Sequence, residues 1–178
     1  ITVNKNVTLD GTVDENGVVN PDAEAQLKDA GTVDLVLNGT ITSGNLSGYT
    51  WGCMRVMPGT KLVISAGENG KFINTASWSA INVCGGEVVV NGGSFESAAV
   101  CFYVYTDSDA ANDAKSTKLT INGGTFKADS PNGVIDNVNP SCATVIINGG
   151  TFIGWDPSAY VDTSVHTVTE NNGVWTGQ

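Results

Sequence analysis

Three aspartates in one polar stretch, Asp107, Asp109 and Asp113, have the types and spacing that come closest to a metal site. Carboxylate oxygens on a loop are ligands that Ca²⁺ accepts, so these three side chains are candidate calcium ligands. Their spacing does not follow the EF-hand pattern, which needs a glycine and a distal glutamate. The alternative is a solvated loop that protrudes from the fold, and on that interpretation the chain binds no metal or other cofactor.

The cysteines and the histidine form no recognisable zinc motif. The chain has four cysteines, Cys53, Cys84, Cys101 and Cys142, with no CxxC pair, and one histidine, His166. Structural zinc sites are usually built from such pairs, so the sequence does not predict one. Two interpretations of the cysteines stay open: buried thiols in a tightly packed core, or a disulfide between neighbouring repeats.

Aromatic residues recur at a spacing that would place them on one surface. The segments 51–56 and 78–83 both start with tryptophan, at Trp51 and Trp78, and align residue for residue 27 positions apart. Tyr103 and Tyr105 follow in the next segment of this series. These four side chains are candidates for stacking against a glycan, and the alternatives are a structural ladder or an interface between chains.

An eight-residue pattern accounts for this spacing, because it occurs three times. It starts at Val88, Leu119 and Val145, each time with alternating apolar residues, then Asn-Gly-Gly, then Ser or Thr and a phenylalanine. Weaker copies start at Leu35 and Leu62, so the steps between copies are 27, 26, 31 and 26 residues. A period in this range on short apolar strands is typical of a solenoid. The sequence therefore predicts an all-β fold, a right-handed parallel β-helix of about five rungs.

Two ladders of identical side chains follow from this prediction. Residues one repeat apart should lie directly over one another, about 4.8 Å apart. Phenylalanine should then form a ladder in the core, and asparagine a second ladder at the turn. The phenylalanines are Phe95, Phe126 and Phe152, and the asparagines are Asn91, Asn122 and Asn148.

A second strand in each rung should bury one face and expose the other. The predicted inward row is Met54, Ile81, Phe102 and Ile135, accompanied by Val56, Val83 and Val104. The predicted outward rows are Cys53, Ala80, Cys101 and Val134, and beside them Arg55, Asn82, Tyr103 and Asp136. Small apolar groups on an outer face indicate a covered surface, so these outward residues are candidates for an interface in a homo-oligomer, a dimer or a trimer. The alternatives are that a neighbouring loop covers the row, or that the register is wrong by one residue.

The two ends of the chain should close the solenoid, and the whole chain should be one domain. We expect an N-terminal strand and capping helix in 1–34, rungs in 35–153, and a C-terminal cap with a β-hairpin in 154–178. The helix is predicted from Asn20 as N-cap, Pro21 at the first helical position and Gly31 as the stop. The hairpin is predicted from Asn171-Asn172-Gly173 between two apolar stretches.

Composition excludes two classes of partner. The formal net charge is −10, and the chain has eight basic against 18 acidic residues. Nucleic-acid binding needs clustered Lys and Arg, so no nucleic-acid partner is predicted. No apolar run approaches the length of about 18 residues that spans a membrane.

The repeats resemble those of right-handed parallel β-helices of the pectate-lyase-like superfamily, in which asparagine and aromatic ladders are common. The segment from Asn148 to Val161, with the later Thr-Glu-Asn-Asn-Gly-Val-Trp, looks like the C-terminal signature of uncharacterised β-helix surface proteins from bacteriophages and gut bacteria. This resemblance implies a surface role and does not imply a chemistry. Enzymes of the superfamily use an arginine or lysine base near acidic calcium ligands, or a close pair of carboxylates. Arg55, the only arginine, is matched in the next rung by Asn82, and the resemblance therefore does not extend to a catalytic site.

The sequence therefore predicts a non-enzymatic structural or interaction protein. Its most favoured role is a bacteriophage virion surface component, such as a head fibre, a capsid decoration or a tail-associated spike, that oligomerises along the β-helix and contacts other virion proteins. One alternative is a bacterial cell-surface adhesin or glycan-binding module, and the other is a polysaccharide lyase or hydrolase. The predicted location is the virion surface, the extracellular space or the bacterial cell surface.

Overall fold

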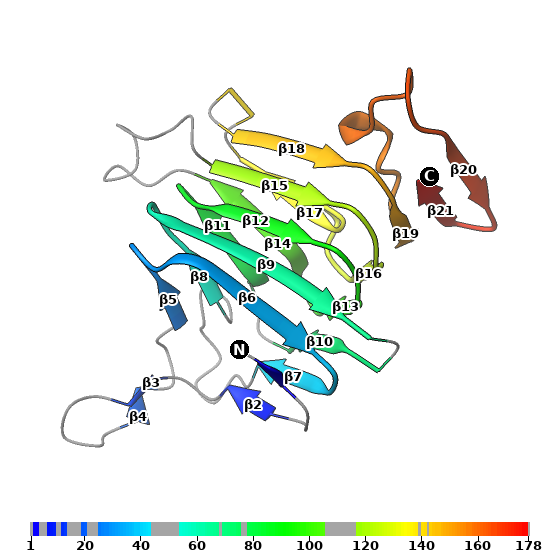
Figure 1. Cartoon of the computed structure of the whole chain (residues 1–178). Coiled ribbons are helices and arrows are strands. Elements are labelled where there is room, and N and C mark those ends of the chain that lie inside the picture. Colours follow the sequence, from blue (N-terminus) through cyan, green and yellow to red (C-terminus); the bar gives the residue numbers. More distant parts are fainter. Residues whose placement is uncertain are drawn as a thin grey trace.

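A computed structural model shows three sheets of parallel strands that wind into a β-solenoid (Figure 1). It describes residues 2–3, 7–9, 12–13, 19–20, 25–43, 54–67, 69–75, 78–105, 117–138, 140–141 and 143–177. The first sheet contains, in spatial order, β1 (Thr2–Val3), β6 (Gly31–Leu37), β9 (Thr60–Ala66), β12 (Glu87–Val90), β15 (Thr117–Ile121) and β18 (Ala143–Ile147). The second contains β2 (Val7–Leu9), β7 (Thr40–Ser43), β10 (Lys71–Asn74), β13 (Ser94–Ser97), β16 (Thr125–Ala128) and β19 (Gly150–Ile153). The third contains β5 (Ala25–Leu27), β8 (Met54–Val56), β11 (Ser79–Cys84), β14 (Val100–Tyr105) and β17 (Ile135–Asn137).

The predicted stacking of one repeat on the next is confirmed by the strand register. Val88 of β12 pairs with Leu119 of β15, and Leu119 pairs with Val145 of β18. The strands β6–β7–β8, β9–β10–β11, β12–β13–β14 and β15–β16–β17 make four turns, and β18 and β19 begin another. Ahead of these turns, β1, β2 and β5 add one parallel strand to each of the three sheets. The five predicted rungs are thus these four turns and the incomplete turn of β18 and β19.

The weakest repeat was placed two residues too far along the chain. Val33, and not Leu35, pairs with Leu62, while Leu35 pairs with Ile64. A shift of two residues leaves every side chain on the same face of the strand, so the predicted core residues stay in the core.

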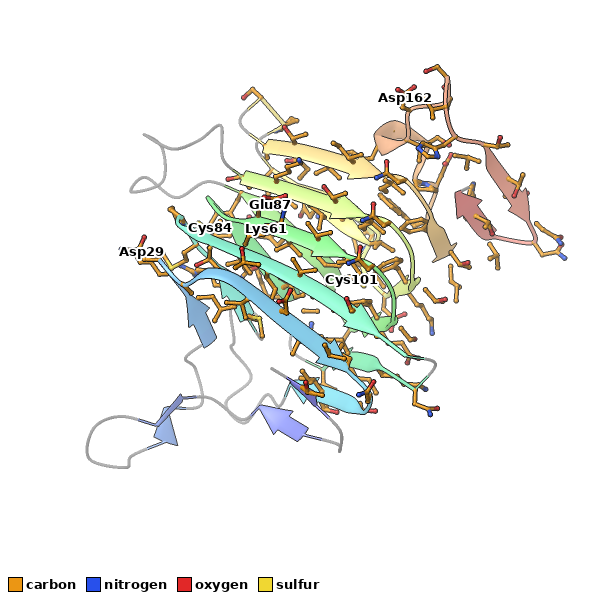
Figure 2. The ribbon with its side chains drawn as sticks, in the orientation of Figure 1. Asp29, Lys61, Cys84, Glu87, Cys101 and Asp162 are labelled. Carbon is orange, nitrogen blue, oxygen red and sulfur yellow. The ribbon has the colours of Figure 1, made fainter. Side chains whose placement is uncertain are left out.

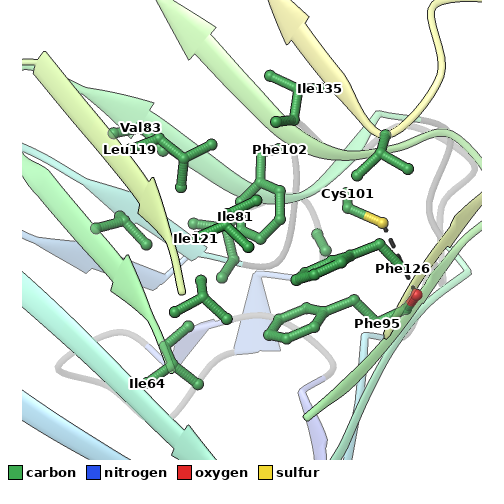
Figure 3. Close-up of a cluster of buried hydrophobic side chains, with 14 of the residues drawn as sticks. Ile64, Ile81, Val83, Phe95, Cys101, Phe102, Leu119, Ile121, Phe126 and Ile135 are labelled. Atoms are coloured by element: carbon green, nitrogen blue, oxygen red, sulfur yellow. Dashed lines mark hydrogen bonds between the residues drawn. The ribbon is translucent and has the colours of Figure 1, made fainter. Parts of the chain in front are cut away.

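The phenylalanine ladder fills the middle of the solenoid, as predicted, and Phe72 extends it by one turn. Neighbouring ring centroids along Phe72, Phe95, Phe126 and Phe152 are 5.9, 5.2 and 5.1 Å apart, and the rings are nearly parallel. All four side chains are fully buried. Each contributes about 2 kcal/mol by burial alone. Figure 3 shows Phe95 and Phe126 stacked beside Phe102 from the third sheet.

The Asn-Gly-Gly turns connect the first sheet to the second at a sharp corner. The Asn122 amide nitrogen donates to the Asn91 side-chain oxygen at 2.9 Å, and the Asn148 amide donates to Asn122 at 2.8 Å, so the predicted asparagine ladder is confirmed. The second glycine of the turn has a positive φ, +118° at Gly124. A Cβ atom there would lie 2.9 Å from the Gly93 carbonyl oxygen, so the corner requires glycine.

The predicted N-terminal capping helix is wrong for the residues that the structure describes. Val19–Asn20 form β4, which pairs antiparallel with β3 (Thr12–Val13), and Ala25–Leu27 form β5, which pairs in parallel with β8. The cap-like residues around Asn20 are local signals, and pairing with the edge of the third sheet outweighs them. Residues 21–24, which include Pro21, lie outside the described residues.

The C-terminal hairpin is confirmed. β20 (Val168–Asn171) and β21 (Val174–Gly177) are antiparallel, and β21 also pairs with β19, so the hairpin covers the last strand of the second sheet. Trp155 lies 5.6 Å from Phe152, and its ring stacks on Tyr160 of the short 3₁₀ turn Ser158–Tyr160 at 6.0 Å. These aromatic side chains therefore cover the end of the phenylalanine ladder.

Candidate functional site

The outer face of the third sheet brings together several of the residues that the sequence singled out. Arg55, Asn82, Tyr103 and Asp136 are register partners on β8, β11, β14 and β17. Ile81, Phe102 and Ile135 face inward and are buried, as are Val56, Val83 and Val104. The predicted register of this sheet is therefore confirmed. Arg55, Tyr103 and Asp136 are partly exposed, whereas Asn82 is buried.

The second predicted outward row does not face outward. Ala80, Cys101 and Val134 are fully buried and belong to the hydrophobic core, so they offer no surface to another chain. The cause is a local distortion: the Val134 carbonyl accepts hydrogen bonds from both Cys101 N and Phe102 N, each at 3.0 Å, and two consecutive side chains then point inward. The expectation of an interface along this row was wrong, because the chain itself covers it. Cys53, the fourth member, lies outside the described residues.

The Cys101 thiol is a free, buried group that points across the interior toward the second sheet. Its Sγ donates to the Lys127 carbonyl at 3.4 Å and lies 3.9 Å from the Phe95 carbonyl oxygen (Figure 3). Burial raises the pKa of this thiol to about 12, and the hydrogen bond to Lys127 opposes only part of that effect. The interpretation as a buried structural thiol is confirmed for Cys101, whereas Cys142 lies outside the described residues.

Three aromatic rings and one guanidinium form the centre of the outer face, which we call the aromatic face: Trp78, Tyr103, Tyr105 and Arg55. The Trp78 and Tyr103 rings meet edge to face at 5.2 Å, and Tyr103 lies 5.0 Å from Tyr105. The Arg55 guanidinium lies 5.8 Å from the centre of the Tyr105 ring, within the range of a cation–π contact. Trp78 is 36% exposed and the two tyrosines are partly exposed, so the face presents aromatic surface to solvent. Trp51, the other predicted stacking residue, lies outside the described residues.

Polar side chains on the same strand are covered. The Ser79 hydroxyl donates to the Asn82 side-chain oxygen at 2.6 Å, and both residues are buried. Cys84, at the end of β11, is also fully buried. Asn82 is therefore a structural residue of this sheet and no longer a candidate for contact with a partner, while Arg55 and Tyr103 remain candidates.

A carboxylate lies at one end of the aromatic face. The Asn132 amide donates to Asp136 Oδ2 at 2.7 Å. Burial, and then the nearby Asp136 charge, raise the pKa of the Tyr103 and Tyr160 hydroxyls above their ordinary value. Sequence reasoning missed this grouping, because the C-terminal cap brings Tyr160 within electrostatic range of Asp136, and no repeat signal predicts that proximity.

The remaining site predictions are not tested by the described residues. Asp107, Asp109 and Asp113 lie in the stretch 106–116, outside them. Within the described part of the chain, no group of three or more His, Cys, Asp or Glu side chains is placed to hold a metal ion. Arg55 is adjacent to Asn82 across the strands, as expected.

One pocket of the described residues lies on a different corner from this face. It follows the second sheet and is lined by Glu96, Ala98, Lys127 and Asp129, with the buried Asn74–Ser97 hydrogen bond of 2.9 Å at its floor. Its volume is about 210 Å³, and pockets for small organic ligands usually measure about 300–1,000 Å³. The aromatic face has the shape of an open sheet, which suits an extended ligand better than an enclosed one.

No helix in the described part of the chain has the length and apolar character to cross a membrane. Comparisons of the chain with models of protein families, with curated proteins and with solved structures find no match.

Proposed function

We propose that this chain is a non-enzymatic interaction module, a stiff solenoid displayed on a virion surface. The observation that carries the proposal is the continuity of the ladders. Phenylalanine rings stack from Phe72 to Phe152 without a gap, and the asparagine amides bond one another from Asn91 to Asn148. A core that is filled from turn to turn in this way leaves the outer faces as the surfaces for recognition.

The resemblance of the segment Asn148 to Val161 to phage and gut-bacterial β-helix proteins supports the virion assignment. In such a role the module contacts other virion proteins and copies of itself. A flat contact over five strands and five residues covers roughly 24 by 17 Å, or about 400 Å² per chain. Stable interfaces bury about 800 Å² per partner. A stable oligomer would therefore use two faces of each chain, as a trimer around a common axis does.

Fractionation of virus particles tests this role. The chain should co-sediment with purified particles and be detected on their surface by antibody labelling. Sedimentation equilibrium of the isolated chain at micromolar concentration should give a mass above that of one chain. Recovery with the cell envelope, and not with particles, would contradict the virion role, and a monomeric mass would remove self-association from it.

A second candidate function, a glycan-binding module on the bacterial cell surface, is favoured by the aromatic face. Trp78 is one of few large apolar side chains that the described residues expose, and it is held in place by Tyr103. The C–H groups of a sugar ring pack against such a ring because its face carries partial negative charge. Binding to a glycan array that is lost in Trp78→Ala, and kept in a variant of the exposed Val165, would support this candidate. An array with no bound glycan would remove it.

A further inference from the structure

The Asp136 carboxylate and the exposed Trp78 indole both lie beside Tyr103. Tyr103 and Asp136 are register partners on neighbouring strands, and Trp78 contacts the Tyr103 ring from the side of β11. With strands about 4.8 Å apart, β11 and β17 are about 10 Å apart. Trp78 precedes Asn82, the β11 partner of Tyr103, by four residues, or about 13 Å along the strand, so the ligand has to span several sugar rings. An extended ligand that covers the Trp78 ring therefore reaches Asp136 over the same tyrosine.

The groups around Asp136 include both hydrogen-bond acceptors and hydrogen-bond donors. Asp136 Oδ2 accepts from Asn132, whereas Oδ1 accepts no hydrogen bond from the described residues. Asn132 is exposed, and its side-chain oxygen is also an acceptor. The hydroxyls of Tyr103 and Tyr160 are protonated at neutral pH because the ordinary pKa of tyrosine is about 10, and burial and then Asp136 raise this pKa further. Such a set complements the hydroxyl groups of a sugar, which donate and accept.

The charge of this end of the face is negative. Arg55 is the cation of the same outward row, but it is three strands away from Asp136, or about 14 Å. The Debye length is about 8 Å at physiological ionic strength, so Arg55 does not neutralise Asp136 for a ligand bound there. The net charge of −10 for the whole chain acts in the same direction.

We propose that Trp78, Tyr103 and the Asn132–Asp136 pair form a subsite that selects saccharides without carboxylate groups. One sugar ring packs on Trp78, and a hydroxyl of a ring further along the saccharide donates to Asp136 Oδ1. The carboxylate of an acidic sugar would face the Asp136 carboxylate and be rejected. This inference rests on the glycan-binding candidate and adds the substrate class to it.

Isothermal titration with three tetrasaccharide probes tests the subsite: cellotetraose, chitotetraose and tetragalacturonate. The wild-type chain should bind a neutral probe and not tetragalacturonate. Asp136→Asn should weaken binding of the neutral probe by about tenfold, the scale of a partly exposed hydrogen bond to a charged group, and should permit binding of tetragalacturonate. Asp129→Asn is the matched control, because it removes the same charge from an exposed residue on another corner.

The outcomes separate the subsite from the underlying function. If Trp78→Ala abolishes binding but Asp136→Asn and Asp129→Asn behave alike, the glycan-binding function stands and the Asp136 subsite is wrong. Preference of the wild-type chain for tetragalacturonate would also overturn the subsite. If the wild-type chain binds none of the probes and no glycan on an array, the glycan-binding candidate fails, and the subsite fails with it.

Discussion

Phe126 lies in the middle of the phenylalanine ladder, so its removal is the most direct test of the stacked core. Its ring lies 5.2 Å from Phe95, 5.1 Å from Phe152 and 5.9 Å from Phe102, and it is fully buried. Phe→Ala substitutions in cores cost about 3–5 kcal/mol, because the transfer free energy is lost and a cavity is left. Contacts with three rings place Phe126→Ala near the top of that range, at about 4–5 kcal/mol.

Urea-induced unfolding followed by far-UV circular dichroism measures this cost. Domains of this size are stable by about 5–15 kcal/mol, so Phe126→Ala removes a large share of the total and the variant can fail to fold. Phe126→Leu provides the second measurement, because it keeps an apolar side chain but loses the ring contacts, and it should cost about 1–2 kcal/mol. Thr125→Ala, on the outward side of the same strand, should change stability by less than about 0.5 kcal/mol. Equal effects of Phe126→Leu and Thr125→Ala would refute the stacked core.

Three further predictions concern the turns and the buried thiol. Asn122→Ala removes both ladder hydrogen bonds of an exposed residue and should lower the free energy of unfolding by about 1–2 kcal/mol in the same urea assay; no loss would mean that the ladder is not stabilising. Gly124→Ala should cost more than about 1 kcal/mol, because alanine disfavours a φ of +118° and its Cβ would meet the Gly93 carbonyl, and a thermal melt like that of the wild type would contradict the turn geometry. Folding raises the pKa of the Cys101 thiol from 9.0 to about 12, so the unfolded chain loses this proton at a lower pH than the folded chain does. The free energy of unfolding should therefore fall as the pH rises from about 9 toward 12. Cys101→Ala should remove that part of the pH dependence, and a variant with the same pH profile as the wild type would show that the thiol is not buried as described.

The strong repeats were predictable because packing imposes the same residue on every turn. Val88, Leu119 and Val145 face one another in the core, so the spacing of the copies determines the register. The first copy was misplaced because its turn differs in length. Ile41 follows Leu35 by six positions, whereas Phe72 follows Leu62 by ten positions, although Ile41 and Phe72 pair. A shared Asn-Gly sequence at the turn predicts the strand register only between copies whose turns have the same length.

Two errors had other physical causes. The residues around Asn20 indicate the conformation that an isolated segment prefers. They do not predict that β5 pairs in parallel with the edge strand β8. The inward direction of Cys101 depends on a carbonyl that accepts two hydrogen bonds from successive residues, and alternation cannot predict where a strand is distorted in this way. The direction of a side chain next to such a distortion depends on the hydrogen bonds to the neighbouring strands, and not on the sequence of its own strand alone.

The outward positions of the first and third sheets hold different kinds of residue. On the first sheet, the outward positions Lys61, Glu87 and Lys118 form a charge ladder, with Glu87 at 3.2 Å from Lys61 and 4.0 Å from Lys118; Lys61 and Glu87 are labelled in Figure 2. Exposed pairs of this kind contribute little, about 0–1 kcal/mol, and keep the surface soluble. On the third sheet the outward positions hold Tyr103 and Tyr105, which the core does not need and which are less common on a solvated surface than charged residues. These rings lie outside the phenylalanine core, and the proposed glycan-binding role would account for their position beside Trp78.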